Sequence, residues 1–203
     1  MTNRKQIAAL EARAEAGDRE SQYDIAQRSL SGDGVLLDRQ RARKLMNQAA
    51  ANRHPDANYI LGIWAQTGEF ESENYEVAAR YYETAAELGH AKSMLNLGIL
   101  YQVGVGRPLD VEAARDMYVR ATEAGSGHAA ANLGKLYAAG ALTDGDSDLG
   151  SAIEWYRKAI RLGYAEARTD LEQAQTALGI PASMIGGART KSTSLWKRLL
   201  GIR

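Results

Sequence analysis

Three histidines are the residues of this chain best suited to metal binding or acid–base chemistry. His54, His90 and His128 are the only histidines among the 203 residues, and neutral imidazole is the commonest side-chain ligand of protein-bound metals. Metal ligands must converge on one ion, yet His54 and His90 are 36 residues apart, which is the interval of a repeat described below. The chain contains no His-Glu-x-x-His motif or other close pair of ligands. We therefore expect structural histidines in loops, no metal site and no cofactor.

Two short segments resemble motifs of phosphate binding and of nucleophilic catalysis. Residues 104–108, Gly-Val-Gly-Arg-Pro, are rich in glycine but lack the Gly-Lys-Ser/Thr ending of a phosphate-binding loop, so we interpret them as a turn. Residues 194–197, Ser-Leu-Trp-Lys, match a Ser-x-x-Lys pattern whose partner motifs do not occur in the chain. Neither segment predicts an active site.

An acidic loop is the remaining candidate for chemistry. Asp144, Asp146 and Asp148 alternate along it, as cation ligands do. An EF-hand loop needs a glutamate at its twelfth position, and the twelfth residue counted from Asp144 is Trp155. We interpret the loop as solvated, with Asp148 capping the next helix. No catalytic residue is predicted, and we expect a protein that is not an enzyme.

Composition excludes several other classes. Lys and Arg number 25 and Asp and Glu number 25, so no net charge favours nucleic acid as a partner. Residues 174–203 nevertheless contain basic residues and no acidic one, which gives an acidic body a basic tail. The absence of cysteine excludes disulfides and thiolate metal sites. No apolar run is long enough for a signal peptide or a membrane span, so we expect a soluble, cytoplasmic protein.

A repeat of 36 residues organises the elements that would position any site. Small, aromatic and aliphatic residues keep the same phase through the chain. The recurring sets are Gly17, Arg53, Gly89, Gly125 and Gly163; Ala49, Ala85, Ala121 and Ala159; Met46, Tyr82, Tyr118 and Tyr156; and Ile25, Leu61, Leu97, Leu133 and Leu171.

Each repeat predicts two helices. In the third repeat these cover residues 90–101 and 111–121, and the apolar residues of the second helix recur at i, i+3, i+4 and i+7 on one helical face. Short acceptor side chains precede every second helix and are typical of N-caps; they are Asp38, Asn74, Asp110 and Asp148. Pro55 suits the first turn of its helix.

These patterns predict an all-α fold, a right-handed solenoid of two-helix repeats with nine helices. The predicted domains are a capping half-repeat over 1–17, four repeats over 18–53, 54–89, 90–125 and 126–163, a capping helix over 164–178 and a flexible basic tail over 179–203. One repeat cannot bury its apolar face alone, so stacking of repeats must build a continuous core.

The repeats resemble the Sel1-like family, which is related to the tetratricopeptide repeats. The third repeat has Leu97-Gly98-x-x-Tyr101, and the first has Gly32-x-Gly34-Val35-x-x-Asp38. The fourth has Leu133-Gly134-x-x-Tyr137 and Trp155-Tyr156-x-x-Ala159. The resemblance covers residues 9–172 and implies a scaffold or adaptor that binds other proteins.

In tetratricopeptide arrays the first helices line a concave face, and this relationship implies where a partner would bind. The groove-facing residues on this basis include Tyr23, Gln27, Tyr59, Ile63, Gln66, Leu95, Ile99, Gln102, Ala131 and Lys135. Aromatic and aliphatic side chains beside glutamines suit a peptide or a helix of a partner protein. The alternative is that neighbouring repeats already pack against Tyr23 and Tyr59, and the sequence favours neither interpretation.

The basic tail leaves a second possibility open. If the end of the tail were a helix, it would gather apolar residues on one face, and the contact residues would be Leu195, Trp196, Lys197, Arg198 and Leu199. Such a segment suits an anionic membrane surface, a partner's groove or another copy of this chain. The leading hypothesis is therefore a monomeric protein-binding adaptor. The alternatives are a scaffold held at a membrane surface by the tail and, with less support, a hydrolase.

Overall fold

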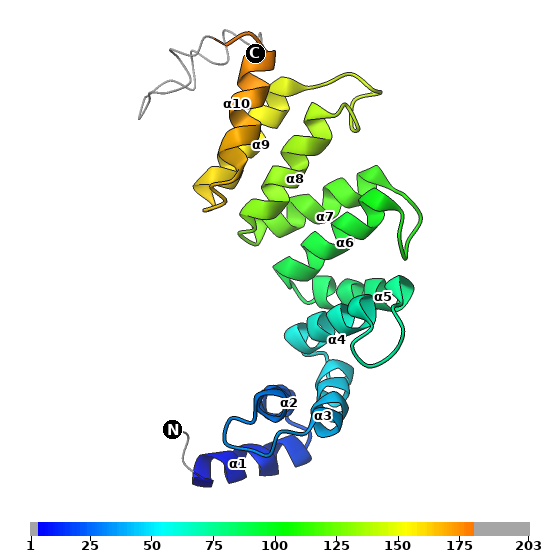
Figure 1. The fold of residues 1–203 in the computed structure, drawn as a ribbon, viewed down its shortest axis with the longest axis vertical. Coiled ribbons are helices and arrows are strands. Elements are labelled where there is room, and N and C mark those ends of the chain that lie inside the picture. The colour runs from blue at the N-terminus through cyan, green and yellow to red at the C-terminus, as the bar shows by residue number, and fades with distance from the viewer. Residues whose placement is uncertain (1–3, 181–203) are drawn as a thin grey trace. The chain divides into compact units, whose positions relative to one another are not determined.

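The computed structural model describes residues 4–180, which form ten α-helices and no β-strand (Figure 1). The predicted all-α repeat fold is confirmed, but the predicted number of nine helices is wrong. Four units of two helices and one helix at each end make ten, since each terminal half-unit supplies a whole helix. They are α1 (Arg4–Glu15), α2 (Arg19–Ser31), α3 (Arg39–Ala51), α4 (Pro55–Thr67), α5 (Tyr75–Glu87), α6 (Ala91–Val103), α7 (Val111–Glu123), α8 (Gly127–Ala138), α9 (Leu149–Arg161) and α10 (Ala167–Ala177).

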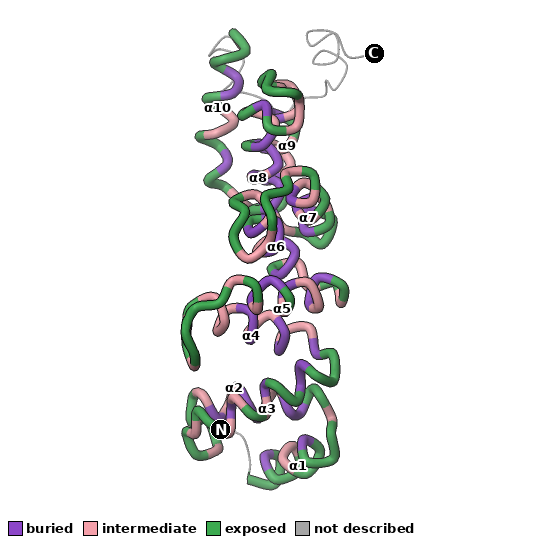
Figure 2. Tube along the Cα trace, turned by 90° about the vertical axis from the view of Figure 1, so that its right-hand side faces the viewer, coloured by how far each residue is buried: buried purple, intermediate pink, exposed green. Residues whose placement is uncertain are grey.

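The chain divides into two compact units, residues 1–124 and 125–203. In the first unit each helix from α2 to α7 packs against the helix before it, and in the second α9 packs against both α8 and α10. Buried residues alternate with exposed ones along every helix, and the loop after α4 is largely exposed (Figure 2). Among the helices of residues 4–180, none combines the length and the apolar character that crossing a bilayer would require.

Helix starts are fixed by side chains at the predicted positions. The residue before α3, α5, α7 and α9 accepts a hydrogen bond from a backbone N–H group of the first helical turn. This satisfies donors that have no partner within the helix. The four residues are Asp38, Asn74, Asp110 and Asp148, as predicted, and Pro55 begins α4.

The residue that closes each second helix has a left-handed backbone. Gly89 has φ 86°, and Gly125 and Gly163 both have φ 93°, a conformation that side chains disfavour. Arg53 occupies the same repeat position with φ 60° and is one of two non-glycine residues with positive φ among residues 4–180. The first repeat therefore ends in a strained arginine where the others use glycine.

The core is built from small residues and tyrosines. Ala85 and Ala121, which share one repeat position, are fully buried. Fully or nearly fully buried tyrosine rings of the second helices lie directly against a glycine of the first helix. The pairs are Gly62 with Tyr82, Gly98 with Tyr118, and Gly134 with Tyr156.

Candidate functional site

The predicted partner-binding residues of the first unit lie on α2, α4 and α6. We call Tyr23, Tyr59, Ile63, Leu95 and Ile99 the first-helix stripe. Four of them are half-buried, and Ile99 is 39% exposed. Isolated exposed apolar residues are ordinary, but here apolar side chains recur at the same positions of successive repeats. Apolar surface on three consecutive first helices is therefore available to a partner.

The ring of Tyr23 is stacked on the imidazole of His54. The ring centroids are 4.4 Å apart and the planes differ by 19°. His54 is the N-cap of α4, where Nδ1 accepts a hydrogen bond from the Ala57 N–H group. Its Nε2 lies 3.0 Å from Oε2 of Glu20. The backbone of the second repeat thus fixes an imidazole, and the imidazole covers one face of Tyr23.

A similar contact recurs one repeat later, but with the ring planes tilted by 42° instead of stacked. The Tyr59 and His90 ring centroids are 4.6 Å apart, and His90 is the N-cap of α6. Its Nε2 lies 3.5 Å from Oδ1 of Asp56, the acidic residue equivalent to Glu20. Burial lowers the pKa of His90, although the negative charge of Asp56 opposes this shift. A neutral imidazole suits the cap, because Nδ1 accepts from the Ser93 N–H group.

His54 and His90 therefore have structural roles, and their specific partners were not predicted from the sequence. His128 was expected in a loop but lies in α8, where its ring is stacked on that of Tyr164 at 4.6 Å. For His54 and His90 the signal was present, because acid, tyrosine and histidine each recur after 36 residues: Glu20 and Asp56, Tyr23 and Tyr59, His54 and His90. Contact between these rings depends on how closely successive repeats approach, which sequence phase alone does not give. Burial also raises the pKa of Tyr23 and of Tyr59, so both phenols stay protonated at neutral pH.

Three predicted glutamines hold tyrosine hydroxyls at the edge of the stripe. Gln27 Nε2 donates to the Tyr23 hydroxyl oxygen at 2.8 Å. The Tyr82 hydroxyl donates to Oε1 of Gln66 at 2.7 Å, and the Tyr118 hydroxyl donates to Oε1 of Gln102 at 2.6 Å. The NH2 groups of Gln66 and Gln102 form no hydrogen bond within residues 4–180, which leaves them as donors for a partner.

Two of the groove residues predicted in the fourth repeat, Ala131 and Lys135, lie on α8 in the second unit. Lys135 is exposed, and its Nζ lies 3.8 Å from Oδ2 of Asp170 on α10. Ala131 was predicted to face the groove, but it is fully buried with Ala167 and Ala174 of α10. That prediction is wrong because this small side chain is enclosed in the cluster formed by α8, α9 and α10.

The other candidate sites predicted from the sequence have separate outcomes. Within the described part of the chain, no group of three or more His, Asp or Glu side chains is placed to hold a metal ion. Asp148 caps α9, and its side chain accepts from the Ser151 N–H group at 2.9 Å. The predicted tail contacts, Leu195, Trp196, Lys197, Arg198 and Leu199, lie outside the described residues.

The repeats match those of known proteins. The family model of the Sel1 repeat matches residues 19–54, 55–90, 91–126 and 127–164, each one residue later than the repeat bounds predicted from the sequence. No sequence among the curated proteins matches the chain.

Solved structures with the same fold include two with more than a quarter of their residues identical. One is a Sel1 repeat protein from Oxalobacter formigenes, with 27% identity and a TM-score of 0.76 over 97% of this chain and 78% of that one. Another is c5321, a protective antigen of uropathogenic Escherichia coli with an SLR fold. It has 26% identity and a TM-score of 0.74, and the match covers 96% of this chain and 40% of that one. By its four matched repeats, this chain belongs to the Sel1 repeat family.

Proposed function

We propose that this chain is a non-enzymatic adaptor that binds a peptide or helix of a partner protein along the first-helix stripe. Proteins built from Sel1 repeats generally serve as modules for protein–protein interaction. The observation that carries the proposal is the recurrence of accessible aliphatic side chains at equivalent positions of α4 and α6. Ile63 and Ile99 are 36 residues apart, Ile63 is half-buried and Ile99 is 39% exposed.

The rings of the stripe support the same proposal. The Tyr23 ring is stacked on one N-cap imidazole and the Tyr59 ring is tilted against another, so both rings are held before a partner arrives. A fixed ring loses little conformational entropy on binding, and binding costs fall when a surface is already ordered. Gln66 and Gln102 place amide NH2 groups beside the apolar side chains. A backbone carbonyl of a bound segment would satisfy these donors.

The test uses the double variant Ile63→Glu with Ile99→Glu in affinity purification from the native cell. Two carboxylates on the stripe would have to lose water when a partner covers them, and burying an unpaired charge is costly. We expect recovery of the partner to fall at least about tenfold, as for loss of an interface anchor. Equal recovery from a variant that keeps the wild-type circular dichroism spectrum would refute the stripe.

The matched control is Leu37→Glu with Leu109→Glu. These leucines also occupy equivalent repeat positions and are 59% and 66% exposed, but they lie in the loops between the two helices of a repeat and not on α4 or α6. The control makes the same chemical change at the same number of sites. Recovery should match the wild-type protein.

Peripheral membrane contact through the basic tail is a second proposal. It rests on the sequence of residues 174–203, where Arg and Lys accompany Leu195, Trp196 and Leu199 and no acidic residue occurs. Basic and apolar residues together favour anionic bilayers. Cosedimentation with anionic vesicles should be lost when 190–203 is deleted; equal cosedimentation would exclude the tail. Fractionation of the native cell tests the cytoplasmic location that we also propose.

A further inference from the structure

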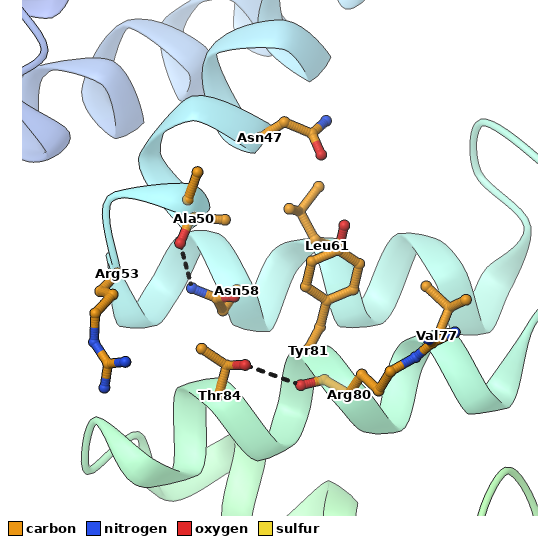
Figure 3. Close-up of a pocket in the computed structure, with 10 residues that line it drawn as sticks. Asn47, Ala50, Arg53, Asn58, Leu61, Val77, Arg80, Tyr81 and Thr84 are labelled. Carbon is orange, nitrogen blue, oxygen red and sulfur yellow. Dashed lines mark hydrogen bonds between the residues drawn. The ribbon is translucent and has the colours of Figure 1, made fainter.

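A groove lies between the second helices of two successive repeats, on surface that the first-helix stripe does not include (Figure 3). Residues of α3 and α5 form its walls, and residues of α4 form its floor. Its volume is about 540 Å³, which is within the roughly 300–1,000 Å³ typical of ligand pockets. The groove is therefore large enough to admit side chains of another molecule.

The centre of the groove is apolar, and the buried polar side chain beside it, Asn58, is held by hydrogen bonds. Leu61 and Tyr81 lie together at its centre (Figure 3). Asn58 is 3% exposed, and its Nδ2 donates to the backbone carbonyls of Ala50 at 3.2 Å and His54 at 2.9 Å. An apolar side chain could thus enter without breaking a hydrogen bond.

Comparison with the neighbouring repeats shows what is particular to this groove. The equivalent surface one repeat earlier, between α1 and α3, is a smaller pocket of about 340 Å³ lined by Glu15, Lys44 and others. At four positions of this surface, the equivalent residues of successive repeats differ in charge. In chain order, with the residue of this groove in the middle, the first three sets are Glu11, Asn47 and Glu83; Glu15, Ala51 and Glu87; and Gly17, Arg53 and Gly89. The fourth set is Lys44, Arg80 and Asp116, again with the residue of this groove in the middle.

In the neighbouring repeats, arginines at this surface are paired, whereas Lys44 forms no ion pair within residues 4–180. Arg41 Nη2 lies 2.7 Å from Oε1 of Glu11, and Arg107 Nη2 lies 2.6 Å from Oε2 of Glu83. Arg120 of α7 reaches α5, where its Nη2 donates to the Ala86 carbonyl at 2.9 Å. Acceptors of the protein itself therefore satisfy these arginines.

The middle groove has cations without such partners. It is lined by Arg53 and Arg80 and by no acidic residue. Within residues 4–180, neither guanidinium forms an ion pair or a hydrogen bond, although both side chains are exposed. The two acidic residues that the flanking repeats place on the first wall are replaced here by Asn47 and Ala51. The groove is thus cationic where its equivalents are neutral or acidic.

Arg53 is also maintained at a cost in backbone strain. Its φ of 60° is a conformation that the other repeats assign to glycine. The backbone is held on both sides, because the Arg53 N–H donates to the Ala50 carbonyl at 2.9 Å and the Arg53 carbonyl accepts from Arg19 Nη1 at 3.0 Å. A strained residue that leads a long cationic side chain into a groove is a candidate for function.

We propose that this groove is a second binding site, which takes an acidic segment of a partner protein. An apolar side chain of the segment packs on Leu61 of the floor and Tyr81 of the wall, and carboxylates on either side of it meet Arg53 and Arg80. The two arginine side chains lie at opposite sides of the opening in Figure 3, with Asn58 and Thr84 between them. That separation fits carboxylates spaced along a chain better than one compact anion. Guanidinium groups bind carboxylates with directed hydrogen bonds.

The probe is a display library of random short peptides selected against the full chain. We expect enrichment of peptides with Asp or Glu on both sides of an aliphatic or aromatic residue, and affinity that falls with added salt. Absence of acidic enrichment would overturn the proposal. Equal affinity for free dicarboxylates would overturn the assignment to a protein segment.

The decisive variant is Ala51→Glu with Arg53→Gly, which gives the groove the residues that both neighbouring repeats carry. The neighbouring repeats fold with these residues at the same positions, so we expect a melting temperature at or above that of the wild type. Affinity for a selected acidic peptide, measured by fluorescence anisotropy, should weaken at least about tenfold. Lys44→Asp is the matched control, because it removes a cation at the position of the neighbouring surface that is equivalent to Arg80. This variant should bind the peptide as the wild type does.

Unchanged affinity of the folded double variant would overturn the second site. A second outcome would also overturn it: peptide binding is lost in the double variant Ile63→Glu with Ile99→Glu but kept in Ala51→Glu with Arg53→Gly. The peptides would then occupy the first-helix stripe and not the groove. The two sites therefore fail separately.

Discussion

At the scale of single residues, the glycine of each first helix is set by the ring that packs on it. A Cβ atom added at Gly98 would lie 2.6 Å from Cε1 of Tyr118, well inside van der Waals contact. The ring cannot move away easily, because it is fully buried and its hydroxyl is bonded to Gln102. In the first repeat Ala26 stands at the glycine position and Met46 at the tyrosine position, and both are fully buried. A larger residue on one helix is matched by a less rigid one on the other.

This pairing predicts a compensated double mutant. Gly98→Ala alone should overpack the contact and lower the free energy of unfolding by about 1–3 kcal/mol. Gly98→Ala with Tyr118→Met reproduces the pair of the first repeat and should recover much of the loss, although the hydrogen bond to Gln102 is gone. Urea unfolding of the four proteins of the cycle measures the coupling. Additive effects would mean that the two positions do not share one space.

At the scale of helices, the features that depend on neighbouring residues in the sequence could be predicted. N-cap side chains, left-handed glycines and the apolar phase each depend on residues within one or two helical turns, and Asp38, Asn74 and Asp110 cap as predicted. The contacts of Tyr23 and Tyr59 with N-cap histidines were missed, because they join different repeats. Burial of Ala131 was missed because it depends on tertiary packing: this small side chain is enclosed in the cluster that α8, α9 and α10 form.

The N-cap of α6 should make stability depend on pH. Burial lowers the folded-state pKa of His90, whereas the unfolded chain titrates near its ordinary value of about 6.5. Between these two pKa values the unfolded state binds more protons, so the free energy of unfolding rises with pH. The contribution of His90 is present above about pH 6.5 and is lost as the pH falls from there toward the lower, folded-state pKa. The groups facing His90 are Asp56, Lys92, Ser93 and Tyr59, and only Asp56 opposes the shift with negative charge.

The variant His90→Asn isolates this effect. Asparagine caps helices well and does not titrate, while every other ionisable group is common to both proteins. The loss of melting temperature from about pH 7.5 to about pH 5.5 should be larger for the wild type than for His90→Asn. Parallel melting curves across that range would show that the His90 cap does not depend on protonation.

At the scale of the whole molecule, four Sel1 repeats present two surfaces with different chemistry. The first-helix stripe is aliphatic and aromatic, whereas the groove between α3 and α5 is cationic over an apolar floor. Both lie within the first compact unit, residues 1–124. The handedness of the superhelix stays a prediction, as do the monomeric state and the role of the basic tail.

The first-helix stripe is tested most directly by site-specific photo-crosslinking in the native cell. A benzophenone side chain replaces Ile99 on α6 or, in a separate protein, the exposed Glu112 on α7. We expect one partner segment, mapped by mass spectrometry, to crosslink at position 99 and not at 112, and to be lost when Ile63→Glu is added. Equal crosslinking at both positions, or crosslinking at 99 that survives Ile63→Glu, would contradict binding along the stripe.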